Sequence, residues 1–356
     1  MNKSKYSISR IRITLRQKKI ERLRRKSADK KRQRNIRNNN RKKSFYEEKP
    51  KQNSYKYTPP KELTIKLESN FSLIEDSVNV LGFVNTINKV IKRGRNKLIK
   101  IDLSDVVKID IGAIGLLLSK MNELSQRHFY AFGTMPKDAT CKTIISESGF
   151  LEHMRDLKGN KIETKEHKSM MVNRGFDKTS NSMVGAEIRN VVKHLTGEEN
   201  TYRPIFSMVQ EMCANSIEHA NEKNKNWLFS VYYKDTETVC FTMTDIGHGI
   251  LETLRKKATQ IVSDFLKSDI DILDRAFDKK YASVTNDINR NKGLPKIKKI
   301  VINNYVNNLI VITNNVLLNF SDESNSKILN KKFNGTFYYW ELNKKCIDIW
   351  KNRSLL

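Results

Sequence analysis

Residues 211–219 read Glu-Met-Cys-Ala-Asn-Ser-Ile-Glu-His. They lie within the longer segment 203–221, whose apolar side chains recur at helical spacing, so we predict a helix there. Glu211, Asn215 and His219 are four residues apart and therefore project from one stripe of that helix. An Asn can supply a neutral oxygen to Mg²⁺, and a Glu one turn away can orient or deprotonate a water. Alone, the same spacing is also typical of a solvated helix face, and a His on such a face is more often structural than catalytic.

A glycine-rich turn begins thirty residues after Asn215. Residues 227–233 and 239–244 have the pattern of two antiparallel strands, and the second runs directly into residues 245–249, Asp-Ile-Gly-His-Gly. The two glycines allow the backbone to approach a ligand closely. Asp245 can accept a hydrogen bond from an exocyclic amine such as adenine N6.

A second glycine turn lies further along the chain. Residues 251–289 are a long variable stretch rich in Lys, Asp and Ser, and residues 290–297, Arg-Asn-Lys-Gly-Leu-Pro-Lys-Ile, open another predicted helix. A glycine turn at a helix N-terminus offers free backbone N–H groups to phosphates. Residues 309–313 and 336–342 complete the pattern as two further strands.

This order of motifs resembles the GHKL ATPase superfamily, which includes type II topoisomerases, the heat-shock-90 class, histidine kinases and MutL-type mismatch-repair proteins. The resemblance covers about residues 183–345 and is greatest to the anti-sigma-factor serine kinases. It implies an α/β sandwich that binds ATP together with Mg²⁺. The matched positions are Glu211, Asn215, Asp245, Gly247, Gly249, Lys292, Gly293, Leu294, Gly335 and Thr336.

The resemblance also implies a role for each matched residue. Asn215 would hold the Mg²⁺ that bridges the phosphates, and Glu211 would be the general base. Asp245 would bind adenine, with Thr336 supporting it through a water. The other nucleotide-binding positions belong to the two glycine turns, whose glycines shape the pocket and its lid: Gly247, Gly249, Lys292, Gly293 and Leu294. One departure is Asn291, which stands where the family usually has a glycine, although Asn tolerates a left-handed backbone better than most residues.

An earlier part of the chain alternates strands with helices, which argues for an α/β unit. The predicted strands are residues 63–68, 97–103 and 129–132, and the predicted helices are residues 75–94, a helix that opens at 111–118, and residues 144–154.

This earlier unit resembles the STAS domain (sulfate-transporter and anti-sigma-factor-antagonist type) over about residues 62–160. The matching segments are residues 101–110, with Asp110 at the turn before an apolar helix, and residues 146–150, Ser-Glu-Ser-Gly-Phe. From the residues alone, Asp110 is expected to cap the helix that follows. In partner-switching members of this family, a Ser two positions after the Asp becomes phosphorylated. Here Gly112 stands at that place, so phosphorylation at the usual position is excluded.

Positive charge concentrates at the N-terminus. The chain carries a formal net charge of +28, and residues 1–43 hold 19 Lys and Arg against Glu21 and Asp29. Such side chains gain affinity for phosphate by releasing counterions, whatever the base sequence. Three interpretations of this arm stay open: a solvated disordered tail, an anchor to nucleic acid, and an anchor to acidic lipid.

The sequence therefore predicts an α/β protein with a disordered basic arm. Four scattered cysteines without a CxxC pair indicate neither a disulfide framework nor a zinc site. No apolar run approaches the roughly 18–20 residues that a bilayer span needs. We expect reduced thiols, no membrane span and a cytoplasmic location. The predicted parts are the arm and linker (1–61), the STAS-like domain (62–160), a linker (161–182), the GHKL-type ATPase domain (183–345) and a C-terminal tail (346–356).

Three functions fit this organisation. The first is an ATP-binding regulatory protein, a slow Mg²⁺-dependent ATPase or a nucleotide switch, that acts through a protein partner. The second is a serine protein kinase that acts in trans on a partner protein. The third is a nucleic-acid-binding adaptor that uses residues 1–43. Whether the chain is an enzyme stays open, and so does a homodimer, since GHKL domains often dimerise.

Overall fold

The computed structural model describes most of the chain after residue 60 and one segment before it. The described residues are 25–38, 61–94, 97–156, 158–162, 170–174, 178–219, 226–258, 268–278 and 293–353. The chain divides into two compact units, residues 1–59 and residues 60–356, and each is considered by itself.

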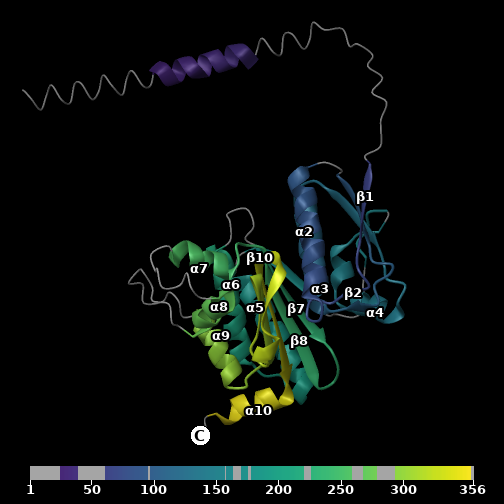
Figure 1. Cartoon of the computed structure of the whole chain (residues 1–356), viewed down its shortest axis with the longest axis vertical. Coiled ribbons are helices and arrows are strands. Elements are labelled where there is room, and N and C mark those ends of the chain that lie inside the picture. The colour runs from purple at the N-terminus through teal and green to yellow at the C-terminus, as the bar shows by residue number, and fades with distance from the viewer. Residues whose placement is uncertain are drawn as a thin grey trace, which may run out of the picture. The chain divides into compact units, whose positions relative to one another are not determined.

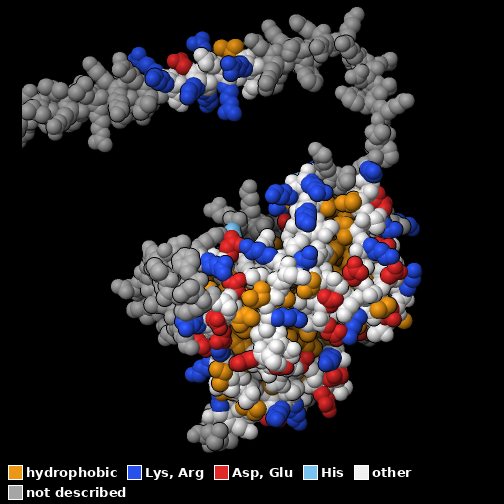
Figure 2. Space-filling model, viewed as in Figure 1, with side chains coloured by type: hydrophobic (Ala, Val, Ile, Leu, Met, Phe, Trp, Pro, Cys, Tyr) orange, Lys and Arg blue, Asp and Glu red, His pale blue; other side chains and the backbone are white. Residues whose placement is uncertain are grey.

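In the first unit, residues 25–38 form a helix whose residues are all exposed. It carries seven Lys and Arg against a single acid, Asp29. Figure 2 shows these basic side chains around the helix. Its largest apolar side chain, Ile36, is 52% exposed, so this helix has no apolar face packed on a core.

The second unit is mixed α/β and contains a parallel and an antiparallel sheet (Figure 1). Its first part has a three-stranded parallel sheet in the order β1-β3-β5 and a short parallel pair β2-β4. The strands are β1 (Glu62–Lys66), β2 (Asn70–Phe71), β3 (Leu98–Asp102), β4 (Lys108–Ile109) and β5 (Tyr130–Thr134). The helices are α2 (Ser77–Arg93), α3 (Ile111–Gln126), α4 (Ala139–Glu147) and the 3₁₀ helix η1 (Phe150–His153).

The second part is built on a five-stranded antiparallel sheet in the order β6-β7-β8-β10-β9. Its strands are β6 (Met170–Arg174), β7 (Asn226–Tyr233), β8 (Thr238–Asp245), β9 (Asn307–Asn319) and β10 (Lys327–Asn343). The helices are α5 (Lys178–Thr196), α6 (Arg203–His219), α7 (Ile250–Ala258), α8 (Asp269–Phe277), α9 (Gly293–Ile302) and α10 (Lys344–Asn352), with the 3₁₀ helix η3 (Glu323–Asn325).

Side chains alternate between the two faces of each strand, and in this sheet both faces are buried against other elements. One face, which we call the α6 face, packs on α5, α6, α8 and α9 and includes Trp227, Phe229, Phe241, Tyr338 and Trp340. The opposite face, which we call the α3 face, shares a core with α2 and α3 and includes Leu228, Ile310, Ile312, Leu317, Leu329, Phe333 and Phe337. The parallel and antiparallel parts of residues 60–356 therefore share the hydrophobic core on the α3 face, and the α6 face has a second core of its own.

Helix α3 approaches its face of the sheet through glycines. A Cβ atom at Gly112 would lie 2.7 Å from Cζ of Phe337, and one at Gly115 would lie 3.4 Å from Cδ2 of Leu228. Beside this contact the sheet has three buried hydroxyls without a hydrogen-bond partner among the described residues, those of Ser230, Thr242 and Thr244. Because Gly112 and Gly115 carry no side chain, α3 can pack closely on the sheet at these two positions.

The start of α3 confirms the expected cap. Asp110 Oδ1 accepts a hydrogen bond from the Ala113 backbone N–H at 2.7 Å. Its Oδ2 accepts from Ser72 Oγ at 2.6 Å and from the Ile74 backbone N–H at 2.9 Å. Burial raises the pKa of Asp110, and these hydrogen bonds oppose that rise. One carboxylate therefore caps α3 and ties it to the loop before α2.

The structure extends several predicted segments and corrects others. Strands β1, β3 and β5 lie where three strands were predicted, within two residues at each end. The predicted linker 161–182 instead contains strand β6 and the first turn of α5, and the predicted tail 346–356 contains most of α10. The variable stretch 251–289 holds most of α7 and all of α8, which begins with a capping box between Ser268 and Asp271.

The remaining predictions about chain chemistry concern thiols and membranes. All four cysteines are free and buried, as expected for a chain without a disulfide framework. None of the helices in the described part of the chain combines the length and apolar character that a bilayer crossing requires.

Candidate functional site

Helix α6 carries the first two predicted site residues on the flank of a buried stripe. Ile205, Met208 and Met212 are fully buried in the core of the α6 face. Their spacing leaves Glu211 and Asn215, one turn apart, partly exposed beside that stripe. The core therefore fixes the rotation of α6 and with it the direction of the acid and the amide. The side chains of Glu218 and His219 lie outside the described residues.

The start of α9 lies directly on this pair. A Cβ atom at Gly293, the first residue of α9, would lie 3.0 Å from Glu211 Oε2. It would lie 3.7 Å from both Nδ2 and Oδ1 of Asn215. Segments predicted separately, around residues 211 and 293, are therefore adjacent in space. Leu294 packs, partly buried, on the core of the α6 face.

Not every residue of the second glycine turn can be placed. Lys292, a predicted nucleotide contact, lies outside the described residues, as do Arg290 and Asn291. What the structure describes of this turn begins at Gly293 and continues into α9, whose first turn contains no acidic residue.

Asn215 has a weakly engaged hydrogen-bond donor. Its Nδ2 atom is buried and makes no hydrogen bond of ordinary geometry with the described residues, although the amide lies near the Tyr338 hydroxyl. A buried amide nitrogen without a partner costs free energy unless a ligand or water satisfies it. Its oxygen and nitrogen are equally far from the Gly293 position, so either atom can be turned toward a ligand at the start of α9. The Nδ2 donor fits a ligand that brings oxygen acceptors, and the Oδ1 atom of the same amide can bind a hard cation.

Asp245, at the end of β8, has a dense set of donors. The Ser216 hydroxyl, next in sequence to Asn215, donates to Asp245 Oδ2 at 3.2 Å. Burial raises the pKa of Asp245 to about 6, opposed by hydrogen bonds from Ser216, the Thr336 hydroxyl and the backbone N–H groups of Thr336 and Gly247. The carboxyl is thus held in place by protein donors and is ionised above about pH 6.

The turn after Asp245 is held by β9. Gly249 has a φ of +80°, and a Cβ atom there would lie 2.5 Å from Asn314 Oδ1, so this position requires glycine. Asn314 Nδ2 donates to the His248 carbonyl at 2.9 Å, and the Ile250 backbone N–H donates to Thr313 Oγ1 at 2.9 Å. These bonds fix the path of the chain from Asp245 into α7.

Gly335 and Thr336 lie beside Asp245 across the sheet. Thr336 is the partner of Asp245 in the β8-β10 ladder and is buried. Gly335 has a φ of +145°, and a Cβ atom there would overlap the backbone carbonyl oxygen of Asp245. Thr313 Oγ1 donates to the Gly335 carbonyl at 3.0 Å. The predicted closing motif is therefore part of the wall around Asp245.

Four further residues belong to this site and were not predicted. Ser216 and Lys296 contact Asp245 and Glu211, respectively, while Thr313 and Asn314 hold the glycine turn. The adjacent asparagines Asn314 and Asn315 inside an otherwise apolar strand were the available signal for an irregularity. Asn314 has a φ of +53°, and the β9-β10 register shifts next to it.

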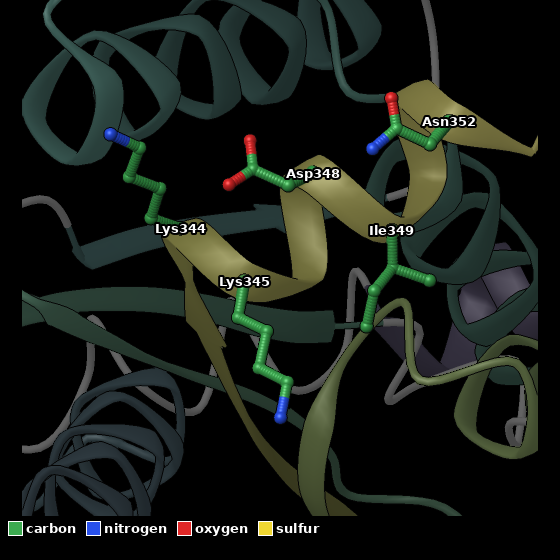
Figure 3. Close-up of a pocket in the computed structure, with 5 residues that line it drawn as sticks. All are labelled: Lys344, Lys345, Asp348, Ile349 and Asn352. Carbon is green, nitrogen blue, oxygen red and sulfur yellow. The ribbon is translucent and has the colours of Figure 1, made fainter.

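One cavity of the structure lies on α10, away from the residues described above. It has a volume of about 480 Å³ and is lined by five residues of that helix: Lys344, Lys345, Asp348, Ile349 and Asn352. Figure 3 shows these side chains projecting from the single helix in different directions. None of the predicted site residues lines it. Comparison of the chain with protein-family models, curated proteins and solved structures gives no match.

Proposed function

We propose that residues 183–345 bind ATP with Mg²⁺ and act as a slow ATPase or nucleotide switch that signals to a protein partner. The observation that carries this proposal is the convergence of three separately predicted motifs. The first turn of α9 lies against Glu211 and Asn215, and Ser216, the next residue, bonds to Asp245. This arrangement supports the resemblance to the GHKL ATPases that the sequence suggested.

Each residue of the site has a task in this proposal. Asp245, ionised at neutral pH, accepts a hydrogen bond from the adenine amine, which guanine lacks at that position. Asn215 holds Mg²⁺ together with the phosphates, and the ion supplies neutralisation of their charge. Glu211 orients or deprotonates the attacking water. The free N–H groups at the start of α9 bind phosphate oxygens.

One possible acceptor of the terminal phosphate can be judged from residue 112, which lies on the opposite side of the sheet from the proposed ATP site. The position where a STAS-like domain would accept a phosphate is Gly112, which has no hydroxyl and lies against the buried ring of Phe337. Transfer to that position within the chain is therefore excluded. We favour transfer to water, with trans phosphorylation of a partner protein's serine as the second candidate.

A nucleotide titration tests the proposal. ATP, ADP and GTP are titrated with and without Mg²⁺, and we expect Mg²⁺-dependent binding that favours ATP over GTP. Asn215→Ala should abolish the Mg²⁺-dependent part, whereas the matched control Asn190→Ala, an exposed amide on α5, should not. Failure of the wild type to bind any of the three would overturn the proposal, and equal affinity for ATP and GTP would remove the adenine role of Asp245.

Labelled ATP separates the two reaction outcomes. Incubation with candidate partner proteins should place the label in free phosphate if the protein is an ATPase. Label that appears on a partner serine would instead support the kinase.

A nucleic-acid adaptor is favoured by a different observation, the exposed basic helix at residues 25–38. Its seven basic residues against Asp29 fit a phosphate backbone, and Ile36 alone offers little apolar surface for a membrane. Deleting residues 1–43 should lower RNA or DNA affinity and flatten its salt dependence. An unchanged affinity and salt slope would reject the adaptor.

A further inference from the structure

Lys296 is the described basic residue that reaches the candidate site. It lies on the first turn of α9, three residues after Gly293, and its Nζ is 2.9 Å from Glu211 Oε1. Two other lysines follow on the same helix. Lys298 pairs with Asp274 at 2.8 Å and with Asp278 at 2.6 Å, so its charge is engaged on α8, whereas Lys299 is exposed.

The Glu211 carboxylate lies between the ammonium group of Lys296 and the start of α9. One oxygen meets the ammonium of Lys296, and the other would be 3.0 Å from a Cβ atom at Gly293, where α9 begins. A helix N-terminus carries a partial positive charge, and α9 places no acid of its own in the first turn. Glu211 therefore occupies the position that a phosphate group would take between Lys296 and the helix start.

This pairing has a consequence for the proposed chemistry. The carboxylate oxygen Oε1 of Glu211 is engaged by Lys296, so this oxygen is not available to orient a water. The pair is accessible to a solute, because the side chains of Lys296 and Glu211 are 46% and 28% exposed. The buried Nδ2 of Asn215 beside it makes no hydrogen bond of ordinary geometry, although the amide lies near the Tyr338 hydroxyl, so it is a donor available to the oxygen atoms of a ligand.

We infer that Lys296 is a ligand of the terminal phosphate of ATP, and that it exchanges Glu211 for that phosphate when ATP binds. The inference rests on the proposed function. A terminal phosphate carries more negative charge than one carboxylate and attracts Lys296 more strongly. Release from Lys296 leaves Glu211 free to act on water. ADP lacks the terminal phosphate, so it leaves the Lys296–Glu211 pair in place, and the site distinguishes ATP from ADP.

The test compares affinities for ADP and for a non-hydrolysable ATP analogue in four proteins: the wild type, Lys296→Ala, Lys296→Arg and the control Lys299→Ala. We expect Lys296→Ala to lose about tenfold or more of the preference for the analogue over ADP, while ADP affinity changes little. Lys296→Arg should restore most of the preference, which a merely structural role of the side chain would not predict. Lys299→Ala should match the wild type.

The outcomes separate this inference from the proposed function. If Lys296→Ala binds both nucleotides with the wild-type preference, the role of Lys296 is wrong and the proposed function stands. If the wild type binds neither nucleotide, both are wrong. A thermal melt of each variant confirms that the proteins compared are folded.

Discussion

The two faces of the five-stranded sheet are both buried, yet they meet their helices in opposite ways. On the α6 face, Glu211 and Asn215 lie against the start of α9, and Asp245 at the end of β8 bonds to the adjacent Ser216. On the α3 face, Gly112 and Gly115 remove side chains so that the helix closes on the sheet. The α6 face keeps polar groups available for a ligand. On the α3 face, the two glycines let the helix pack directly on the sheet. Replacing Glu211 on the first should change chemistry, and filling the Gly112 position on the second should change stability.

Glu211→Gln should have the largest effect on activity. The amide cannot act as a base, so ATP turnover should fall by about 10²–10⁴-fold while the unfolding midpoint stays close to wild type and ATP affinity does not fall, because Gln no longer competes with phosphate for Lys296. Steady-state release of phosphate measures this. The control Glu237→Gln makes the same chemical change at the exposed turn before β8, at the other end of that strand from Asp245. Equal turnover in Glu211→Gln and the wild type would remove Glu211 from the reaction.

Gly335→Ala should have the largest effect on stability. The new Cβ would overlap the Asp245 carbonyl, and the backbone has a φ of +145° that L residues rarely adopt. We expect a loss of more than about 3 kcal/mol in the free energy of unfolding, measured by urea denaturation. Gly82→Ala is the control, because a Cβ there meets nothing within 4 Å inside helix α2. It should stabilise by roughly 0.5–1 kcal/mol, and a similar loss in both variants would contradict the steric argument.

Gly112→Ser tests the α3 face. Its Cβ would lie 2.7 Å from Phe337 Cζ, so we expect the free energy of unfolding to fall by about 1–3 kcal/mol. The comparison variant is Gly115→Ala, whose Cβ would make ordinary contact at 3.4 Å with Leu228 and should be tolerated. Adding Phe337→Leu to Gly112→Ser should recover part of the loss. Simple additivity of the two changes would show that the ring and residue 112 do not interact.

Asp245→Asn should give an effect on stability that depends on pH and vanishes at low pH. The folded-state pKa of about 6 lies above the ordinary 3.8, so the folded protein holds a proton that the unfolded chain releases between these values. Wild-type stability therefore falls as pH rises through this window, whereas Asn has no proton to lose. We expect the variant to be more stable than wild type by on the order of 2 kcal/mol at pH 8, with the difference shrinking toward pH 4.

The same substitution should weaken the preference for ATP over GTP, because the amide cannot replace the carboxylate as an acceptor at full strength. Denaturation curves at several pH values and a nucleotide titration measure the two effects. Parallel stability profiles for the two proteins would contradict the raised pKa of Asp245.

Local patterns in the sequence predicted much of the fold. Alternating and helical periodicities located β1, β3, β5 and the paired strands β7 and β8, and the cap at Asp110 followed from its place before an apolar run. Strand β6 and the start of α5 were missed because their surroundings, residues 161–182, are polar and charged. The pairing of β6 with β7 is a tertiary contact, which local periodicity does not contain.

The candidate site was predictable in its separate motifs and not in its contacts. Spacing placed Glu211 and Asn215 on one stripe and Asp245 at a strand end. Lys296 was missed because its role depends on how α9 packs against α6, and Ser216 because it lies outside the stripe of Glu211 and Asn215. The packing of Phe337 on Gly112 likewise joins distant segments, so it has no signature in either one.

The hydroxyls of Ser230, Thr242 and Thr244 place polar atoms in the seam under α3, and none of them bonds to a described protein group. Lifting α3 would give these hydroxyls access to water. It would also expose the side chains from Ile111 to Leu118, which are buried in the core, and burial of each large apolar side chain is worth about 1.5–3 kcal/mol. The apolar contribution outweighs that of the hydroxyls, so amide hydrogens of α3 should exchange with solvent as slowly as those of the β8-β10 ladder.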